Sequence, residues 1–148
     1  MSESATKPRP QFRNLGVSDL MSYRLPPAAK ASFLHRISGA LLLLALPLVI
    51  VPLFGQSVHS PETFAAMKAW VATPLCKIVL LVLMWGYFHH FCAGIRFLTL
   101  DLHWGTARVP SKRTGTPVRV APQRSGAVVI GIALGLTVVF GLKLFGVW

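Results

Sequence analysis

The stretch ASFLHRISGALLLLALPLVIVPLF, from Ala31 to Phe54, opens with polar and charged side chains and then becomes almost entirely apolar. A helix needs about 20 apolar residues to cross the hydrocarbon core of a bilayer. Pro47 and Pro52 argue against a soluble helix over this stretch, whereas kinked helices are common in membranes. We therefore predict a first transmembrane helix over 31–54, with its polar turns at one membrane surface.

Two further apolar runs follow, over about 75–100 and 127–145. In lipid a run of this length satisfies its backbone hydrogen bonds only as a helix. The composition agrees, because 53% of the 148 residues are hydrophobic and 13% are charged, against about 25% charged in ordinary soluble domains. We predict an all-α integral membrane protein with three transmembrane helices, in which 1–30 is an N-terminal segment and 31–148 is the membrane anchor domain.

The positive charge is concentrated outside the spans. The chain has 15 Lys and Arg against 4 Asp and Glu, and the first connection, 55–73, contains a single basic residue, Lys68. By the positive-inside rule, the N-terminus and the second connection are expected to be cytoplasmic. A nucleic-acid partner is disfavoured because few aromatic residues interleave the basic ones, so attraction to anionic lipid is the preferred explanation. The basic residues of the two cytoplasmic segments are Lys7, Arg9, Arg13, Arg24, Lys30, Arg108, Lys112, Arg113, Arg119 and Arg124.

The cysteines and the N-terminus narrow the cellular context. Cys76 and Cys92 both lie in the second predicted span, so we expect buried free thiols and no disulfide. The polar lead is longer than a secretory signal and lacks its cleavage site, so the first span is expected to be retained. Glu3 and the weak Arg/Ser pattern do not fit a mitochondrial transit peptide, which favours a bacterial inner membrane.

Ionisable groups inside a span are costly, so each is a candidate functional residue. At about 100° per residue, Ser32, His35, Arg36 and Gly39 lie within about 60° of one direction, which predicts a polar face at the cytoplasmic end of the first span. Snorkelling of side chains to the interface is the alternative. It accounts for Arg36 alone, but it gives no reason for three polar residues to share a face.

The second span carries two consecutive histidines on different faces. Glycines lie one turn before and one turn after His90, whereas His89 shares its face with Trp85 and Arg96. A histidine between two glycines could admit a flat ligand such as haem, for which imidazole is a common axial ligand. The alternative is a close helix crossing in which His90 is bonded to a neighbour. His89 competes with His90 but suits a packing or polar-network role better.

Depth relates these residues to the membrane surface. If Asp101 marks the cytoplasmic boundary, His90 lies about 16 Å and Arg96 about 7 Å inside it. A haem held at His90 could then direct its propionates toward Arg36 and His35. Because His59 and His103 lie in connections, a second axial ligand would have to come from another copy or another subunit.

Two motifs resemble those of a known family. The first is S-x2-H-R-x-[ST]-G, present as SFLHRISG over 32–39, and the second is H-x3-G-x-R-x4-D, present as HFCAGIRFLTLD over 90–101. Both motifs, with three spans in this order, resemble the cytochrome b556 membrane-anchor subunits of succinate dehydrogenase, respiratory complex II. The resemblance covers nearly the whole chain.

The resemblance implies an anchor subunit that binds haem b and ubiquinone and is not itself the succinate-oxidising polypeptide, so no catalytic residue is assigned. Its partners would be a second membrane-anchor subunit, with which it shares the haem and a heteromeric helix bundle, an iron-sulfur subunit and a flavoprotein subunit. By its place in the second motif, His90 would be an axial ligand of the haem iron. Ser32 and Arg36 would bind the quinone, and His35 and Arg36 would lie near the haem propionates.

The chain also departs from the family pattern. The segment before the first motif is only loosely similar, which leaves the N-terminal docking segment in question. Phe97 replaces a histidine that many relatives have after the second motif's arginine, so no haem contact by a histidine is available there. Three alternatives stay open: the anchor of a quinol:fumarate reductase, a cytochrome b subunit of another dehydrogenase, which would more often need at least four spans, and a purely structural anchor or small transporter.

Overall fold

The computed structural model describes residues 16–147. A short helix, α1 (Val17–Ser22), precedes the first long helical segment, which is built from α2 (Pro27–Ala45), the π-helical turn η1 (Leu46–Ile50) and α3 (Val51–His59). A second short helix, α4 (Pro61–Val71), leads into α5 (Pro74–Asp101). The strands β1 (Ala107–Pro110) and β2 (Pro117–Val120) then form a hairpin before α6 (Gln123–Leu144).

Prolines set the starts of the helices. Pro27, Pro61 and Pro74 each occupy the first turn of α2, α4 and α5, where a missing N–H costs nothing because it would have no intrahelical partner. Inside the first long segment, Pro47 cannot donate to the carbonyl one turn earlier, and the chain passes through η1, where the N–H of Val51 bonds to the carbonyl of Leu46.

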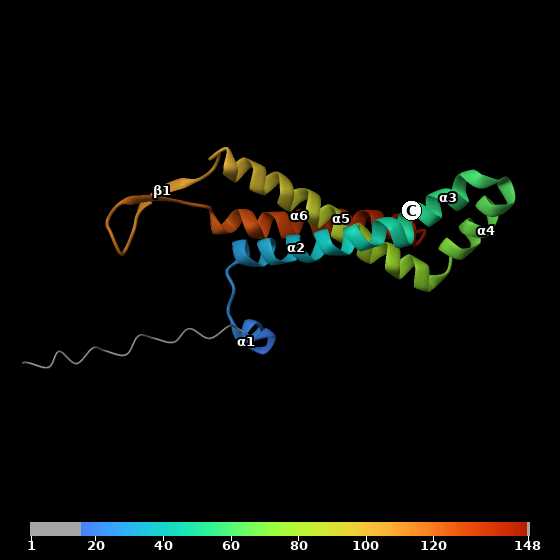
Figure 1. Ribbon diagram of the computed structural model, residues 1–148, viewed down its shortest axis with the longest axis horizontal. Helices are drawn as coiled ribbons and strands as arrows, with labels where there is room; N and C mark the ends of the chain where they lie inside the picture. Colours follow the sequence, from blue (N-terminus) through green and yellow to red (C-terminus); the bar gives the residue numbers. More distant parts are fainter. Residues whose placement is uncertain (1–15, 148) are drawn as a thin grey trace, which may run out of the picture.

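Three helical segments are long and apolar enough to cross a membrane: Pro27–His59, Pro74–Asp101 and Gln123–Leu144. They correspond to the three predicted spans, and α2, α5 and α6 pack along one another as an elongated bundle (Figure 1). The first segment is longer than expected, because the helix continues through α3 into what the sequence suggested was a connection. The fold is therefore an integral membrane helix bundle.

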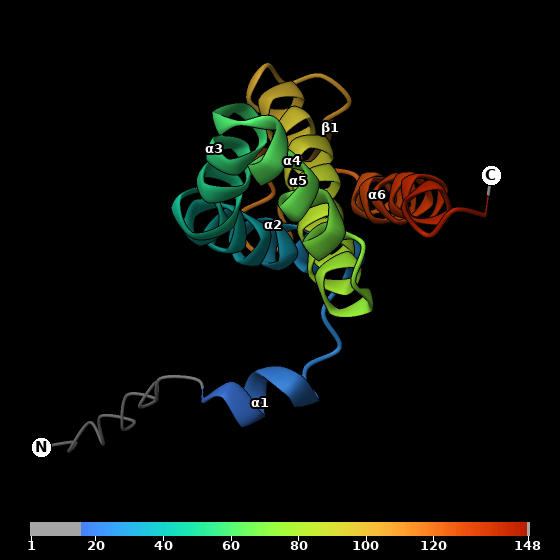
Figure 2. The same ribbon diagram turned by 90° about the vertical axis from the view of Figure 1, so that its right-hand side faces the viewer.

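Small residues form the contacts between the helices, and large apolar residues face outward. Ala31, Ala93 and Ala133 are wholly buried, whereas Leu43 and Leu48 are both 72% exposed. This distribution is the reverse of a water-soluble bundle and suits a lipid environment, in which close approach of the backbones holds the helices together. Viewed along the bundle, α2 and α5 cross and α6 runs beside them (Figure 2).

Both connections contain structure that the sequence analysis did not predict. In the first, α4 folds back against α3. In the second, β1 and β2 pair antiparallel, with Arg108 opposite Arg119 and Val109 opposite Val118. The hairpin lies at the same end of the bundle as α1, and α3 and α4 lie at the opposite end (Figure 1).

Candidate functional site

His90 lies where α5 crosses α2. Its Nδ1 is 3.2 Å from the backbone carbonyl oxygen of His35 and 3.5 Å from the Oγ of Ser38. The two imidazoles of His35 and His90 stack with centroids 4.2 Å apart and planes 8° from parallel. Because a carbonyl oxygen can only accept, it favours the proton on Nδ1 and leaves the lone pair on Nε2.

An apolar groove adjoins this histidine. It has a volume of about 780 Å³ and lies between the second half of α2, η1 and the middle of α5. Such a volume is typical of sites for small molecules and cofactors. His90 and Tyr87 are the polar side chains that line it, and the remaining lining is Leu42, Leu43, Ala45, Leu46, Ile50, Leu80, Leu83, Met84 and Leu144.

The arrangement of His90 is that of many metal-ligating histidines. Such residues commonly donate one ring N–H to a carbonyl or carboxylate, which fixes the tautomer and orients the other nitrogen toward the metal. A haem-sized ligand could lie in the adjoining groove, so the residues present fit a haem iron. Within residues 16–147, no group of three His, Cys, Asp or Glu side chains could hold a metal ion by itself.

His89 has a different environment. Its side chain is 0% exposed, its Nε2 lies 3.3 Å from the carbonyl oxygen of Ala31, and its ring stacks on Trp85 with centroids 5.6 Å apart. Its Nδ1 is buried and has no hydrogen-bond partner among the described residues. An imidazole enclosed in this way packs α5 against α2 and has no room for an external ligand.

The glycines around His90 serve the helix crossing. A Cβ at Gly39 of α2 would lie 3.0 Å from the Cε1 of His90, and one at Gly86 would lie 3.2 Å from Leu41. A Cβ at Gly94 would come within 3.8 Å of the Nε2 of His35. The side chains of α2 therefore occupy the space over these glycines, as the close-crossing interpretation expected. The groove that could hold a flat ligand lies beside His90 instead.

The polar face expected on the first span is divided between two directions. His35 and Gly39 face α5, where they contact His90. Arg36 is exposed and Ser32 is half-buried, and neither makes a hydrogen bond within the described part of the chain. As residues i and i+4 of one helix, Ser32 and Arg36 are neighbours, so they form a separate polar pair on the outer side of α2.

Sequence reasoning missed some residues that shape the site. Ser38 is 0% exposed, donates its hydroxyl to the carbonyl oxygen of His35 and lies beside His90. Gly39 makes room for the His90 ring. Both belong to the first motif, but their contacts cross from α2 to α5, and no signal within α2 alone identifies the partner. The structure agrees with the expectation for the cysteines, since Cys76 and Cys92 are free thiols.

Comparisons with known proteins agree with this architecture. Residues 6–140 match the family described as "Succinate dehydrogenase/Fumarate reductase transmembrane subunit". The chain is 37% identical over 86 residues to the succinate dehydrogenase cytochrome b556 subunit of Paracoccus denitrificans, and this match covers 58% of this chain and 65% of the relative.

A second relative gives a similar result. The chain is 30% identical over 84 residues to the succinate dehydrogenase cytochrome b556 subunit of Coxiella burnetii, and the match covers 57% of this chain and 67% of that relative. Each match thus spans about two thirds of the relative's length, whereas the family match extends over most of this chain. The chain therefore belongs to the family of succinate dehydrogenase/fumarate reductase transmembrane subunits.

Proposed function

We propose that this chain is the haem b- and ubiquinone-binding membrane-anchor subunit of a succinate:quinone oxidoreductase, through which electrons pass from an iron-sulfur subunit to ubiquinone. The observation that carries the proposal is the state of His90. Its Nδ1 is bonded to the carbonyl of His35 and its ring lines an apolar groove of about 780 Å³. The names of the two relatives, which are cytochromes b556, support the haem.

His90 is the proposed axial ligand. The carbonyl of His35 keeps the proton on Nδ1, the stacked ring of His35 limits rotation of the imidazole, and Gly39 leaves space for it. When bound, haem b would supply a one-electron redox centre inside the membrane. His90 supplies one ligand, so the second would come from a partner subunit. His35 and Arg36 are the proposed neighbours of the haem propionates.

Ser32 and Arg36 are the proposed quinone-binding residues. Their side chains form the outer polar pair of α2 and have no hydrogen-bond partner within residues 16–147, so their donors are available to a ligand that arrives through lipid. A hydroxyl and a guanidinium can donate to the quinone oxygens, and the guanidinium stabilises negative charge that develops there during reduction. In a site of low dielectric each of these contacts is strengthened.

The proposal includes the assembly and its orientation. The partners would be a second membrane-anchor subunit, an iron-sulfur subunit and a flavoprotein subunit, of which the last oxidises succinate. The location would be a bacterial inner membrane, with the N-terminus, α1 and the β1–β2 hairpin on the cytoplasmic side. The basic residues of the hairpin support this orientation.

A quinol:fumarate reductase anchor is the second candidate, because the family description names both enzymes. Its subunit would use the same site with electrons flowing in the reverse direction. A purely structural anchor would differ from both, since it would bind no haem.

The experiment is purification of the tagged chain from its native membrane in mild detergent. We expect a flavoprotein and an iron-sulfur protein to co-purify, with succinate:ubiquinone activity and a reduced-minus-oxidised spectrum of a b-type cytochrome. An intact complex without that spectrum would favour the structural anchor. Menaquinol:fumarate activity that greatly exceeds succinate:ubiquinone activity would favour the fumarate reductase.

A further inference from the structure

A second groove, between α5 and α6, contains a buried cation that the proposed function does not use. Its volume is about 420 Å³. Arg96 and Ser125 are the polar groups at one end, and most of the remaining wall is apolar. The full lining is Cys92, Ile95, Arg96, Thr99, Ser125, Val128, Val129 and Ile132.

Arg96 is held in place but keeps most of its donors free. The residue is only 7% exposed, its Nε donates to the Oγ of Ser125 at 2.8 Å, and its guanidinium lies 5.3 Å from the ring centre of Phe97. Ser125 in turn donates to the carbonyl of Pro122. A guanidinium has five N–H groups, so the terminal ones have no hydrogen-bond partner within residues 16–147.

The charge of Arg96 is also uncompensated within the described chain, since none of the carboxylates between residues 16 and 147 forms an ion pair with it. A buried cation inside a membrane span is costly unless an anion or a dipole accompanies it. Ser125 lies in the first turn of α6, and the positive end of that helix dipole raises the local potential further. The groove is therefore complementary to an anion.

Depth and lining define the kind of anion. Arg96 lies five residues before Asp101, the last residue of α5, or about 7 Å along the helix. It therefore lies just below the membrane surface, where the phosphate groups of lipids are within its reach. From that level the groove continues toward the membrane centre along the apolar side chains of Val128 and Ile132. The matching ligand carries a phosphate at one end and an apolar tail behind it.

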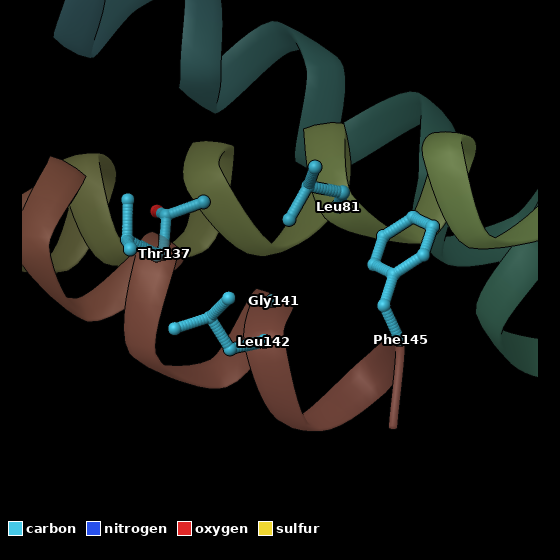
Figure 3. A pocket seen from close by; sticks show the side chains of 6 residues that line it. Leu81, Thr137, Gly141, Leu142 and Phe145 are labelled. Carbon is cyan, nitrogen blue, oxygen red and sulfur yellow. The ribbon is translucent and has the colours of Figure 1, made fainter. Parts of the chain in front are cut away.

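A groove near the other end of α6 provides a contrast. It has a volume of about 290 Å³ and is lined by Leu81, Thr137, Val138, Gly141, Leu142 and Phe145, with no charged side chain (Figure 3). Its one hydroxyl, on Thr137, donates to the carbonyl of Ala133 in the same helix. Apolar contact with any acyl chain explains this second groove, whereas the buried cation of the first requires an anionic group.

We propose that the groove between α5 and α6 binds one anionic phospholipid, with its phosphate on the guanidinium of Arg96 and one acyl chain along Val128 and Ile132. The site goes beyond the proposed function, because it needs neither haem nor quinone. The geometry assigns Arg96 and Ser125 to the headgroup, and the bound lipid fills the contact between the second and third spans.

The test uses the complete complex, extracted in mild detergent and analysed by native mass spectrometry during titration with phosphatidylglycerol. We expect one tightly bound lipid in the unmodified complex and about tenfold weaker binding, or more, with Arg96→Gln, because a hydrogen bond to a charged group is lost. Arg124→Gln is the matched control. It removes a basic side chain from the same helix end, but that side chain is exposed and does not line the groove, so binding should stay within about twofold.

Further arms separate the alternatives. Val128→Trp fills the groove from a position that is 55% exposed, so it should displace the lipid without unfolding the bundle, even if Arg96→Gln fails to assemble. Phosphatidylcholine should bind at least tenfold more weakly than phosphatidylglycerol, because it has no net charge to match Arg96. Inorganic phosphate alone should not displace the lipid.

Several results would overturn the proposal. Equal retention of phosphatidylglycerol by the unmodified complex, Arg96→Gln and Val128→Trp would show that no lipid occupies the groove. Displacement by millimolar inorganic phosphate would indicate a simple anion site. A carboxylate of a partner subunit cross-linked to position 96, with no lipid bound, would show that the charge of Arg96 is neutralised by protein.

Discussion

His89 and His90 are adjacent in the sequence, yet their surroundings give them different chemistry. A rotation of about 100° per residue separates them on α5. His90 therefore reaches the crossing with α2 and the edge of an apolar groove, whereas His89 is enclosed between Trp85 and the backbone of Ala31. For an imidazole to bind a metal, one nitrogen must be both unprotonated and accessible, and the groove makes His90 the candidate.

We predict that His90→Leu removes or strongly perturbs the b-type cytochrome spectrum of the complex, because the proposed axial ligand is lost. His89→Leu is the matched control, with the same substitution one residue earlier. It removes a ring whose Nδ1 already lacks a partner, so the cost in stability should be small. The measurement is the reduced-minus-oxidised spectrum of purified complex per mole of flavin. Loss of the spectrum in His89→Leu alone would reverse the assignment.

The second prediction at this scale concerns the outer polar pair of α2. Ser32→Ala and Arg36→Leu should lower succinate:ubiquinone activity by about tenfold or more, because each removes a donor to a quinone oxygen in a site of low dielectric. Succinate oxidation by a water-soluble dye should be unchanged. Lys30→Leu, which removes an exposed cation from the same helix, should affect neither assay. Equal losses in both assays would indicate defective assembly.

Part of the site was predictable from residue spacing, and part was not. The angular positions along α5 distinguished His90 from His89, since those angles depend on one helix only. The division between Arg36 and His35 could not be read from α2 alone, because it depends on where α5 crosses. Similarly, the glycines around His90 suggested an open surface, but Leu41 and His35 of α2 occupy it.

At the scale of elements, close approach of backbones holds α6 against the other two spans. Gly126 shows this most directly, because a Cβ there would lie 2.6 Å from both the Cα of Ala28 and the carbonyl oxygen of Pro27. These are backbone atoms and cannot move aside as a side chain can. Gly131 lies on the outer side of α6, where nothing approaches within 4 Å of the corresponding position.

We predict that Gly126→Ala destabilises the complex by about 1–3 kcal/mol, since the first turn of α6 must separate from the first turn of α2. Gly131→Ala is the same substitution one and a half turns later and should leave stability unchanged or slightly raised. The measurement is the loss of the b-type spectrum on heating or in a titration with denaturing detergent. Comparable effects of the two substitutions would contradict the proposed packing.

The long elements were easier to predict than the short ones. Hydropathy over about 20 residues gives all three spans, because membrane insertion depends on summed apolarity. It does not reveal α4, whose start is instead marked by Ser60, which accepts a hydrogen bond from the N–H of Thr63, and by Pro61 in the first turn. The strands β1 and β2 have four residues each, too few for a pattern search to separate them from a loop.

At the scale of the whole molecule, the two ends of the bundle differ in charge. The hairpin end carries Arg108, Lys112, Arg113 and Arg119, and Arg24 follows α1 at the same end (Figure 1). Over the same breadth of chain, α3 and α4 contain one lysine, Lys68. This asymmetry counts lysines and arginines within short connections, where the positive-inside rule is reliable.

The asymmetry predicts which end faces the cytoplasm, and single cysteines can test it. Cys92→Ala leaves only Cys76, which is 4% exposed, and Thr114→Cys and Ala65→Cys then each add one exposed thiol, in the hairpin turn and in α4. In intact spheroplasts, a membrane-impermeant maleimide should label Ala65→Cys and spare Thr114→Cys, whereas inverted vesicles should give the opposite pattern. Neither substitution alters a basic residue, so neither disturbs the signal that sets the orientation. Labelling of Thr114→Cys from the outside would place the hairpin, and with it Ser32 and Arg36, on the wrong side for electrons that arrive from the cytoplasm, and the proposed quinone site would fall with it.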